Sequence, residues 1–219
     1  MDTQFWLDRW HQGLIGFHRD EVNEYLRKWF RYIELEPGST VFVPMCGKSL
    51  DMLWLAEQGY QVVANELSLL AAEQFVSENK LACEITDVGE FKLYSMDNIK
   101  IYCGDFFNLL PEYLVDVALI YDRASLIALP EDMRVKYSAH MNSLFAKSTP
   151  GLLITLDYDQ EEMPGPPFSV GEDEVRQHYH QVRMLQSFDV LADNKKFVNK
   201  GASRLQETVW LTSTSPTKE

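Results

Sequence analysis

The stretch Thr40–Ser49 reads TVFVPMCGKS, and it decides the fold class of the chain. Its first half is a short run of apolar and β-branched residues, which predicts a buried strand over 40–44. Gly47-Lys48-Ser49 then turns the chain, and Ser49 is a suitable cap for a helix that runs through Gln58. We expect the inward face of this helix to consist of Leu50, Leu53 and Trp54.

The same pattern of strand and helix repeats along the chain. Apolar runs predict four more strands, over 60–65, 99–103, 115–121 and 151–157. Helices are predicted over 68–79, 130–146 and 172–181, and residues 81–98 fit either a hairpin or a loop insertion. The last two predicted strands, 182–190 and 205–212, are joined by a basic segment without a long helix, which favours an antiparallel edge pair. The chain therefore predicts an α/β fold with a mostly parallel, seven-stranded, Rossmann-like sheet and helices on both faces.

Composition indicates one domain over residues 1–219. Residues 1–36 have aromatic side chains at helical spacing and predict an N-terminal helical cover, while the polar residues 212–219 predict a disordered tail. The formal net charge of −13 argues against nonspecific nucleic-acid binding and against docking on anionic membranes, since both need basic surfaces.

Cysteine usage and the N-terminal residues indicate a cytoplasmic protein. Cys46, Cys83 and Cys103 are odd in number and widely spaced, which fits neither a disulfide framework nor a zinc site. The first residues carry acids and no apolar core of a signal peptide, and no run is long enough for a spanning helix. We also expect no bound metal, because the five histidines have no ligand spacing, and a monomer, because no apolar surface stripe is evident.

Acidic residues follow most of the predicted strands. In open α/β sheets, ligands bind beyond the carboxyl ends of the strands, so these positions should converge on one edge. The acids at the strand ends are Glu66, Asp105, Asp122 and Asp157. This convergence favours a nucleoside ligand.

The positions and the number of glycines exclude two nucleotide-binding motifs. A Walker loop needs a glycine five residues before Gly47, where the chain has Phe42 inside the predicted strand. A dinucleotide fingerprint needs three glycines, and only Gly47 is present. A phosphate cradle is therefore not expected here.

The acids suggest a nucleoside that carries no diphosphate. Glu66 can accept hydrogen bonds from both ribose hydroxyls, although it could also be a solvated or capping acid. Asp105 can accept a hydrogen bond from an adenine amino group and Phe106 can pack on the ring, although Gly104-Asp105 could be merely a turn. S-adenosylmethionine fits these positions, because its sulfonium is positive.

Arg123 is a cation among these acids. It could hold the carboxylate of a methionine moiety or an anionic acceptor, or it could form a local salt bridge to Asp122 or Glu131. Trp10 matters to the site only if the N-terminal segment folds over it, since tryptophans belong to the core by default.

Several long motifs resemble one family. VFVPMCGKSLDM (41–52), with WLDRW (6–10) and GFH (16–18) before it, resembles the bacterial type of thiopurine S-methyltransferase. Glu66, IYDRA (120–124) and DYDQEEMPGPPF (157–168) match the family in order and spacing. The resemblance covers essentially the whole chain and is weakest at 81–98 and 182–204.

The resemblance implies a class I methyltransferase fold with an N-terminal helical cover and S-adenosylmethionine as cofactor. The family methylates the sulfur of thiopurines, and bacterial members are associated with selenium and tellurium species. The carried-over cofactor contacts are Trp10, Met45, Glu66 and Arg123, with Asp105 and Phe106 on the adenine side. The family usually has leucine at the position of Met45, and the exchange preserves size and apolarity. Mammalian relatives have a substrate-side arginine late in the chain, where Lys195 and Lys196 stand here without a firm alignment.

The expected reaction is direct, in-line methyl transfer to a small aromatic thiol or other soft nucleophile, with S-adenosylhomocysteine as product and Arg123 stabilising the thiolate. The segment Pro164–Phe168 could form a wall of the acceptor pocket or be a rigid surface connection. Two alternatives stay open: a methyltransferase for another small acceptor, and a cofactor-binding protein with little turnover.

Overall fold

A computed structural model describes residues 3–215 of the chain. The chain divides into two compact units, Met1–Tyr121 and Asp122–Glu219, and each is described by itself. No helix in the described range is long and apolar enough to cross a membrane.

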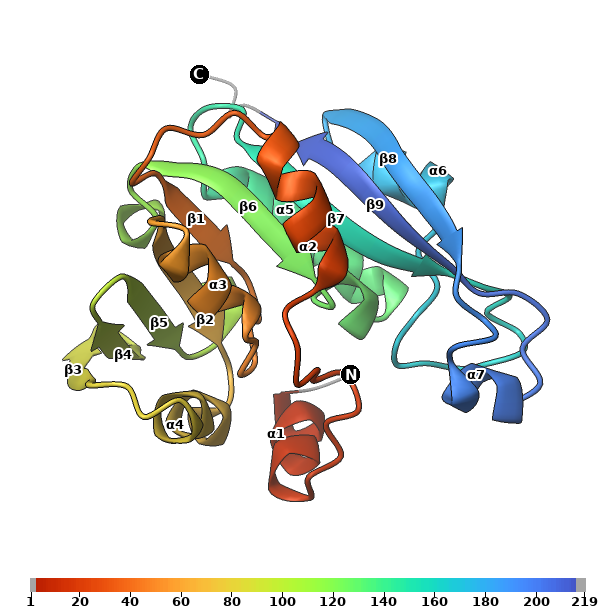
Figure 1. Cartoon of the computed structure of the whole chain (residues 1–219), viewed down its shortest axis with the longest axis horizontal. Helices are drawn as coiled ribbons and strands as arrows, with labels where there is room; N and C mark the ends of the chain where they lie inside the picture. Colours follow the sequence, from red (N-terminus) through yellow and green to blue (C-terminus); the bar gives the residue numbers. More distant parts are fainter. Residues whose placement is uncertain (1–2, 216–219) are drawn as a thin grey trace. The chain divides into compact units, whose positions relative to one another are not determined.

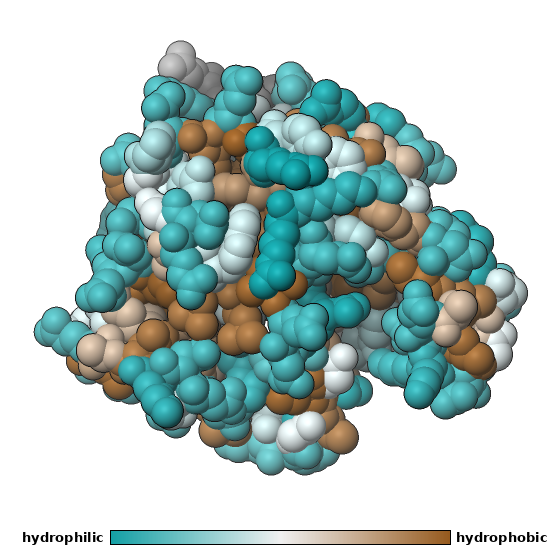
Figure 2. All heavy atoms as spheres, in the orientation of Figure 1, coloured by the Kyte–Doolittle hydropathy of each residue, from teal (hydrophilic) through white to brown (hydrophobic). Residues whose placement is uncertain are grey.

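Hydrophilic side chains are spread over the face shown in Figure 2, with apolar patches between them.

The first unit contains the parallel part of the fold. Its strands are β1 (Thr40–Val43), β2 (Gln61–Glu66), β3 (Glu84–Val88), β4 (Phe91–Met96), β5 (Ile99–Cys103) and β6 (Val117–Arg123), the last of which runs two residues into the second unit. Their order is β3-β4-β5-β2-β1-β6. The pairs β5-β2, β2-β1 and β1-β6 are parallel, and β3 and β4 form an antiparallel hairpin next to β5 (Figure 1).

The helices that follow β1 and β2 begin and end close to the predicted positions. The helices of the first unit are α1 (Thr3–His11), α2 (Glu24–Trp29), α3 (Asp51–Glu57) and α4 (Leu69–Glu78), with short 3-10 turns η1 (Phe30–Tyr32), η2 (Phe106–Asn108) and η3 (Pro111–Tyr113). The Ser68 hydroxyl accepts a hydrogen bond from the Ala71 amide at 3.3 Å, as expected of a helix cap. Both α3 and α4 pack against β2 and β5.

The inward face of α3 differs from the prediction. Met52 and Leu55 are the fully buried apolar residues of this helix, whereas Leu50, Leu53 and Trp54 are only half-buried. The buried Asp51 explains the rotation of the helix, because its carboxylate accepts hydrogen bonds from the Asn23 amide at 2.7 Å and the Tyr121 hydroxyl at 2.8 Å. Asp51 is thus buried, although hydrophobic spacing predicts that Leu50, Leu53 and Trp54 form the inward face.

The second unit is built on antiparallel strands. Its elements are η4 (Leu126–Ala128), α5 (Glu131–Ser143), β7 (Pro150–Asp157), α6 (Glu172–His178), β8 (Gln181–Asp189), α7 (Lys195–Asn199) and β9 (Gln206–Ser213). β9 pairs with β7 on one side and with β8 on the other, both antiparallel, which confirms the expected antiparallel pair at the end of the chain. The buried Trp210 of β9 donates a hydrogen bond to the Thr155 hydroxyl of β7 at 2.8 Å.

Two predictions were wrong: the number of strands and the start of the disordered tail. The described residues contain nine strands rather than seven, because residues 81–98 form the hairpin β3-β4. The tail predicted from residue 212 is ordered at its start: β9 continues to Ser213, and the buried Thr214 donates its amide to the Thr149 carbonyl at 3.0 Å. Residues 216–219 of that prediction lie outside the described residues. The α/β class is confirmed, with parallel pairing among the central strands β5, β2, β1 and β6 of the strand order.

Candidate functional site

The loop after β1 holds an unusual backbone conformation. Met45 has φ +44° and Gly47 has φ +56°, so both lie in the left-handed region that residues other than glycine rarely adopt. The Cys46 amide donates a hydrogen bond to the Asn65 carbonyl at 2.8 Å, which ties the loop to the end of β2. The loop is therefore fixed beside the strand end that carries Glu66.

Glu66 is a buried carboxylate held by backbone amides. It is 5% exposed, and its two oxygens accept hydrogen bonds from the Gly47 amide at 2.8 Å and the Ser68 amide at 2.7 Å. Burial raises the pKa of Glu66, and the hydrogen bonds from the Ser68 and Gly47 amides act in the opposite direction. Glu66 is thus not a solvated acid. Each carboxylate oxygen has a second lone pair, so the group can still accept hydrogen bonds from a ligand.

Trp10 reaches the same loop from the N-terminal cover. Its side chain is buried, and a Cβ atom added to Gly47 would lie 3.3 Å from Cζ2 of the indole ring. The ring of Trp10 also packs edge-on against Phe17, with centroids 5.5 Å apart, and α1 packs against α4. The first unit thus brings Trp10, Gly47 and Glu66 together.

Asp105 and Phe106 follow β5. The Asp105 carboxylate accepts the Phe107 amide at 3.0 Å and thereby caps η2, so the turn-forming role is present. Its second oxygen makes no hydrogen bond to the described residues, and the side chain is half-buried. The Asn65 side-chain amide donates to the Gly104 carbonyl at 3.0 Å, which connects this turn to β2. The Phe106 ring is buried.

Two buried thiols, Cys46 and Cys103, lie close enough to Glu66 to interact with it electrostatically. Burial raises the pKa of the Cys103 thiol to about 12 and that of Cys46 well above its usual value, and the Glu66 carboxylate adds to both shifts. Both thiols therefore stay protonated at neutral pH and are poor nucleophiles. In residues 3–215 no group of three or more His, Cys, Asp or Glu side chains could hold a metal ion.

Arg123 ends β6 and belongs to the second unit. Within the described part of the chain its half-buried side chain makes no hydrogen bond or ion pair, so the local salt bridge to Asp122 or Glu131 is not formed. Asp122 instead accepts the Tyr137 hydroxyl at 2.7 Å, and burial raises its pKa. The guanidinium of Arg123 therefore keeps its donors for another partner.

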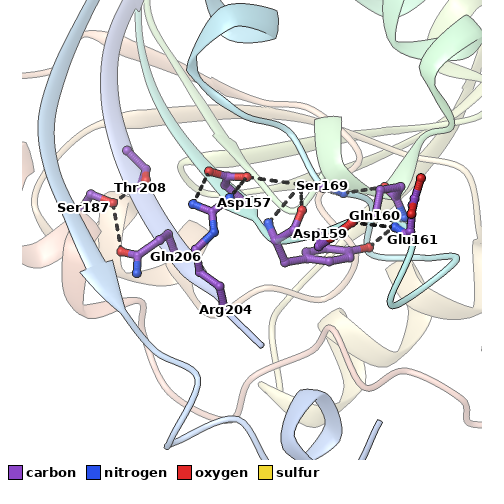
Figure 3. A network of polar contacts seen from close by, with 10 residues as sticks. Asp157, Asp159, Gln160, Glu161, Ser169, Ser187, Arg204, Gln206 and Thr208 are labelled. Carbon is purple, nitrogen blue, oxygen red and sulfur yellow. Dashed lines mark hydrogen bonds and ion pairs between the residues drawn. The ribbon is translucent and has the colours of Figure 1, made fainter. Parts of the chain in front are cut away.

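Sequence reasoning missed an ion pair at the end of β7. Arg204 donates to both oxygens of Asp157, each at 2.9 Å (Figure 3). The two residues are 47 positions apart, and the only signal was the basic composition of the segment before β9. Lys195 and Lys196 are exposed on α7, and the Lys196 ammonium donates to the Pro166 carbonyl at 3.4 Å.

Comparisons with known proteins place this geometry in context. Residues 1–215 match the family described as thiopurine S-methyltransferase (TPMT). The chain is 46% identical to a thiopurine S-methyltransferase of Pseudomonas fluorescens, over 96% of each chain, and 44% identical to that of Pseudomonas putida, over 97% of this chain and 100% of the relative. A solved S-adenosylmethionine-dependent methyltransferase from Anabaena variabilis shares the fold with a TM-score of 0.64 at 14% identity, over 97% of this chain and 95% of the other.

Proposed function

From the premise that this chain belongs to the thiopurine S-methyltransferase family and is an S-adenosylmethionine-dependent methyltransferase, we propose that it methylates the sulfur of thiopurines or of similar small soft nucleophiles. Selenium and tellurium species are included in this acceptor class, because they are soft nucleophiles like sulfur. The observation that carries the proposal is the Trp10-Gly47-Glu66 arrangement at the carboxyl end of β2.

The residues present fit the cofactor. Glu66 is fixed by two amides and retains lone pairs that can accept the two ribose hydroxyls. The loop that contains Met45 would supply apolar contact, and Asp105 has a carboxylate oxygen that could accept an amino group of the base. Phe106 would pack near that base, and Trp10 would cover the nucleoside from the N-terminal side.

S-adenosylmethionine, when bound, supplies an electrophilic methyl group that a soft nucleophile takes in one in-line displacement. The chain then needs no nucleophile of its own, which agrees with the protonated state of Cys46 and Cys103. The role of the protein is to bind and align the reactants and to exclude water. Arg123 would hold an anionic group, either the methionine carboxylate or the acceptor thiolate.

The direct test is a methyl-transfer assay. The purified chain is incubated with S-adenosylmethionine and 6-mercaptopurine, thiophenol or selenite with a reductant, and the release of S-adenosylhomocysteine is measured. We expect turnover with at least one acceptor. Cofactor binding without turnover on any of them, with binding measured by calorimetry with S-adenosylhomocysteine, would instead support a binding protein or an enzyme for another acceptor.

Arg123 can be tested within the same assay. Arg123→Ala should lower kcat/KM about ten- to hundredfold, because it removes charge-assisted hydrogen bonds to a reactant. Arg183→Ala is the matched control, since Arg183 is exposed on β8. Wild-type turnover and cofactor affinity in Arg123→Ala would refute the role given to this residue.

A further inference from the structure

Glu66 is a buried acid that no cation of the described chain pairs with. Its oxygens accept hydrogen bonds from the amides of Gly47 at 2.8 Å and Ser68 at 2.7 Å, which favours the ionised form of the group. No lysine, arginine or histidine among residues 3–215 forms an ion pair with it. Buried carboxylates are usually paired with a cation, because removing a charge from water is costly. The ion pair that burial normally demands is thus missing at Glu66.

The cations that the sequence places next to this site are engaged elsewhere. Lys48 lies in the loop after β1, but its ammonium donates to both oxygens of Glu78 on α4, at 2.7 and 2.9 Å. The guanidinium of Arg9, on α1, lies 4.7 Å from the centroid of the Phe5 ring. The pKa of Glu66 is accordingly raised by burial and lowered by backbone amides, and not by a cation.

Neutral thiols and a second acid lie near Glu66 in the first unit. Cys103 is its neighbour in the pairing of β2 with β5, and the negative charge of Glu66 contributes to the raised pKa values of Cys103 and Cys46. The Gly104 amide donates to the Glu66 carbonyl at 2.8 Å, which brings Asp105 to the same end of the sheet. This part of the site should therefore attract a positively charged ligand more strongly than a neutral ligand of the same shape.

The methyl donor and its product differ in charge. S-adenosylmethionine carries a positive sulfonium on C5′ of its ribose. When the methyl group is transferred, the electron pair of the broken C–S bond stays on sulfur, and the positive charge disappears. A ribose bound to Glu66 would hold this sulfur only a few bonds from the carboxylate, so the attraction between them would be lost with the methyl group.

We propose that the uncompensated charge of Glu66 makes the site discriminate between the cationic methyl donor and its neutral product. The carboxylate accepts the ribose hydroxyls of both forms, and the donor alone gains the electrostatic attraction. Glu66 is then a specificity-determining residue for the charge of the ligand as well as a ribose contact, and methyl transfer itself weakens the hold on the product. This inference rests on the proposed contact between Glu66 and the ribose.

The test is calorimetry of the whole chain with three ligands and no acceptor. The ligands are S-adenosylmethionine, S-adenosylhomocysteine and sinefungin, which carries an ammonium group where the donor has its sulfonium. The measured quantity is the Kd of S-adenosylhomocysteine divided by the Kd of each cationic ligand. In Glu66→Gln both ratios should fall about tenfold, the order expected from removing one of two opposite charges in a partly screened site.

Glu66→Asp separates the charge from the hydrogen bonds. The shorter side chain keeps the charge but displaces its oxygens, so the affinity for all three ligands should fall while both ratios stay within about twofold of the wild type. A loss of affinity that is common to all ligands cancels in the ratio, so a general weakening of the site cannot imitate the expected result.

Glu57→Gln is the matched control. Glu57 is exposed at the end of α3, and the substitution removes the same charge from the same unit, so both ratios should keep their wild-type values. If Glu66→Gln weakens all three ligands equally, or weakens none, Glu66 does not discriminate by charge and the proposal is overturned.

A measurement on the wild type decides the question if Glu66→Gln does not fold. The ligands are then 5′-methylthioadenosine, which is neutral, and its S-methylated sulfonium, and both lack the amino-acid part of the cofactor. We expect the cation to bind about tenfold more tightly. Equal or weaker binding of the cation overturns the proposal.

The outcome is independent of the acceptor, because no acceptor is present. If the chain methylates none of the thiols or selenium species, the proposed function fails, and the ratios still test the role of Glu66. If the chain turns over a thiopurine while Glu66→Gln keeps the wild-type ratios, this inference alone is overturned.

Discussion

Two strand ends of this molecule hold an acid in opposite ways. At the end of β2, Glu66 is 5% exposed and both of its oxygens are bound by backbone amides. At the end of β7, the Asp157 side chain is 30% exposed and is bound mainly by the flexible side chain of Arg204. Backbone amides cannot move away without unfolding the loop, whereas a surface ion pair is worth about 0–1 kcal/mol and can exchange partners. The first arrangement is fixed by the backbone, and the second can adjust.

The largest effect is expected from Glu66→Ala. The change leaves the buried Gly47 and Ser68 amides without acceptors, each worth about 1–3 kcal/mol. We expect a fall of about 2–3 kcal/mol in the free energy of unfolding and more than a hundredfold loss of S-adenosylhomocysteine affinity by calorimetry. Glu57→Ala, at the exposed end of α3, is the control. If Glu66→Ala binds S-adenosylhomocysteine with wild-type affinity, Glu66 is not a cofactor contact and the two strand ends do not differ in this way.

A second ion pair of the second unit sharpens the comparison, because its arginine, Arg134, is buried. Glu174 accepts hydrogen bonds from Arg134 at 3.0 Å and from His178 at 3.1 Å. Burial tends to raise the pKa of Glu174, but these two partners outweigh it and the pKa lies below its ordinary 4.5. Because Arg134 is buried, Glu174→Gln should cost about 2 kcal/mol at neutral pH in urea unfolding.

The effect of pH on the stability of Glu174→Gln follows from the lowered pKa of Glu174. A carboxyl group with a lowered pKa in the folded state stabilises the protein above its unfolded pKa of about 4.5, and this contribution disappears as the pH falls through the folded pKa. The difference between wild type and Glu174→Gln should therefore shrink below pH 4.5. A difference that stays constant from pH 7 to the acid range would contradict the assigned cause.

Gly47→Ala changes the loop whose amide donates to the buried Glu66, and it should have a smaller effect than Glu66→Ala. The φ of +56° costs an alanine about 1 kcal/mol, and its Cβ would lie 3.3 Å from the Trp10 ring. We expect a loss of about 1–2 kcal/mol in thermal or urea unfolding and a weaker cofactor affinity as the ring is displaced. Gly59→Ala, which also has a positive φ but open space around it, controls for backbone strain alone.

The smallest effect is expected from Asp157→Asn. Both partners of this pair are substantially exposed, so the free energy of unfolding should change by less than about 1 kcal/mol. Chemical denaturation of this variant beside Glu66→Ala measures the contrast directly. A loss comparable with that of Glu66→Ala would show that the two strand ends are held alike.

The sequence predicted best where two neighbouring elements fix a position. Glu66 was assigned to a strand end because an apolar run precedes it and the cap Ser68 follows it, and both elements form as expected. The hairpin of residues 84–96 was ambiguous because β3 is exposed along almost its whole length and has no buried face to give an alternating pattern.

Contacts between distant segments could not be predicted from the sequence. The inward rotation of α3 depends on Asp51, whose partners Asn23 and Tyr121 are 28 and 70 residues away. The Asp157–Arg204 pair depends likewise on the antiparallel pairing of β7 and β9. Hydrophobic periodicity describes a single element and carries no information about which polar side chains will meet.

The strand β3 has a consequence for the behaviour of the protein at high concentration. It stands at the end of the strand order and pairs only with β4 within the described residues, so one row of its backbone groups is available to other chains. It is five residues long and carries Glu84 and Asp87, and shortness and charge both discourage pairing between copies. Replacing these two acids with threonine or valine would leave an uncharged β-branched edge next to the exposed Ile85, a template for aggregation.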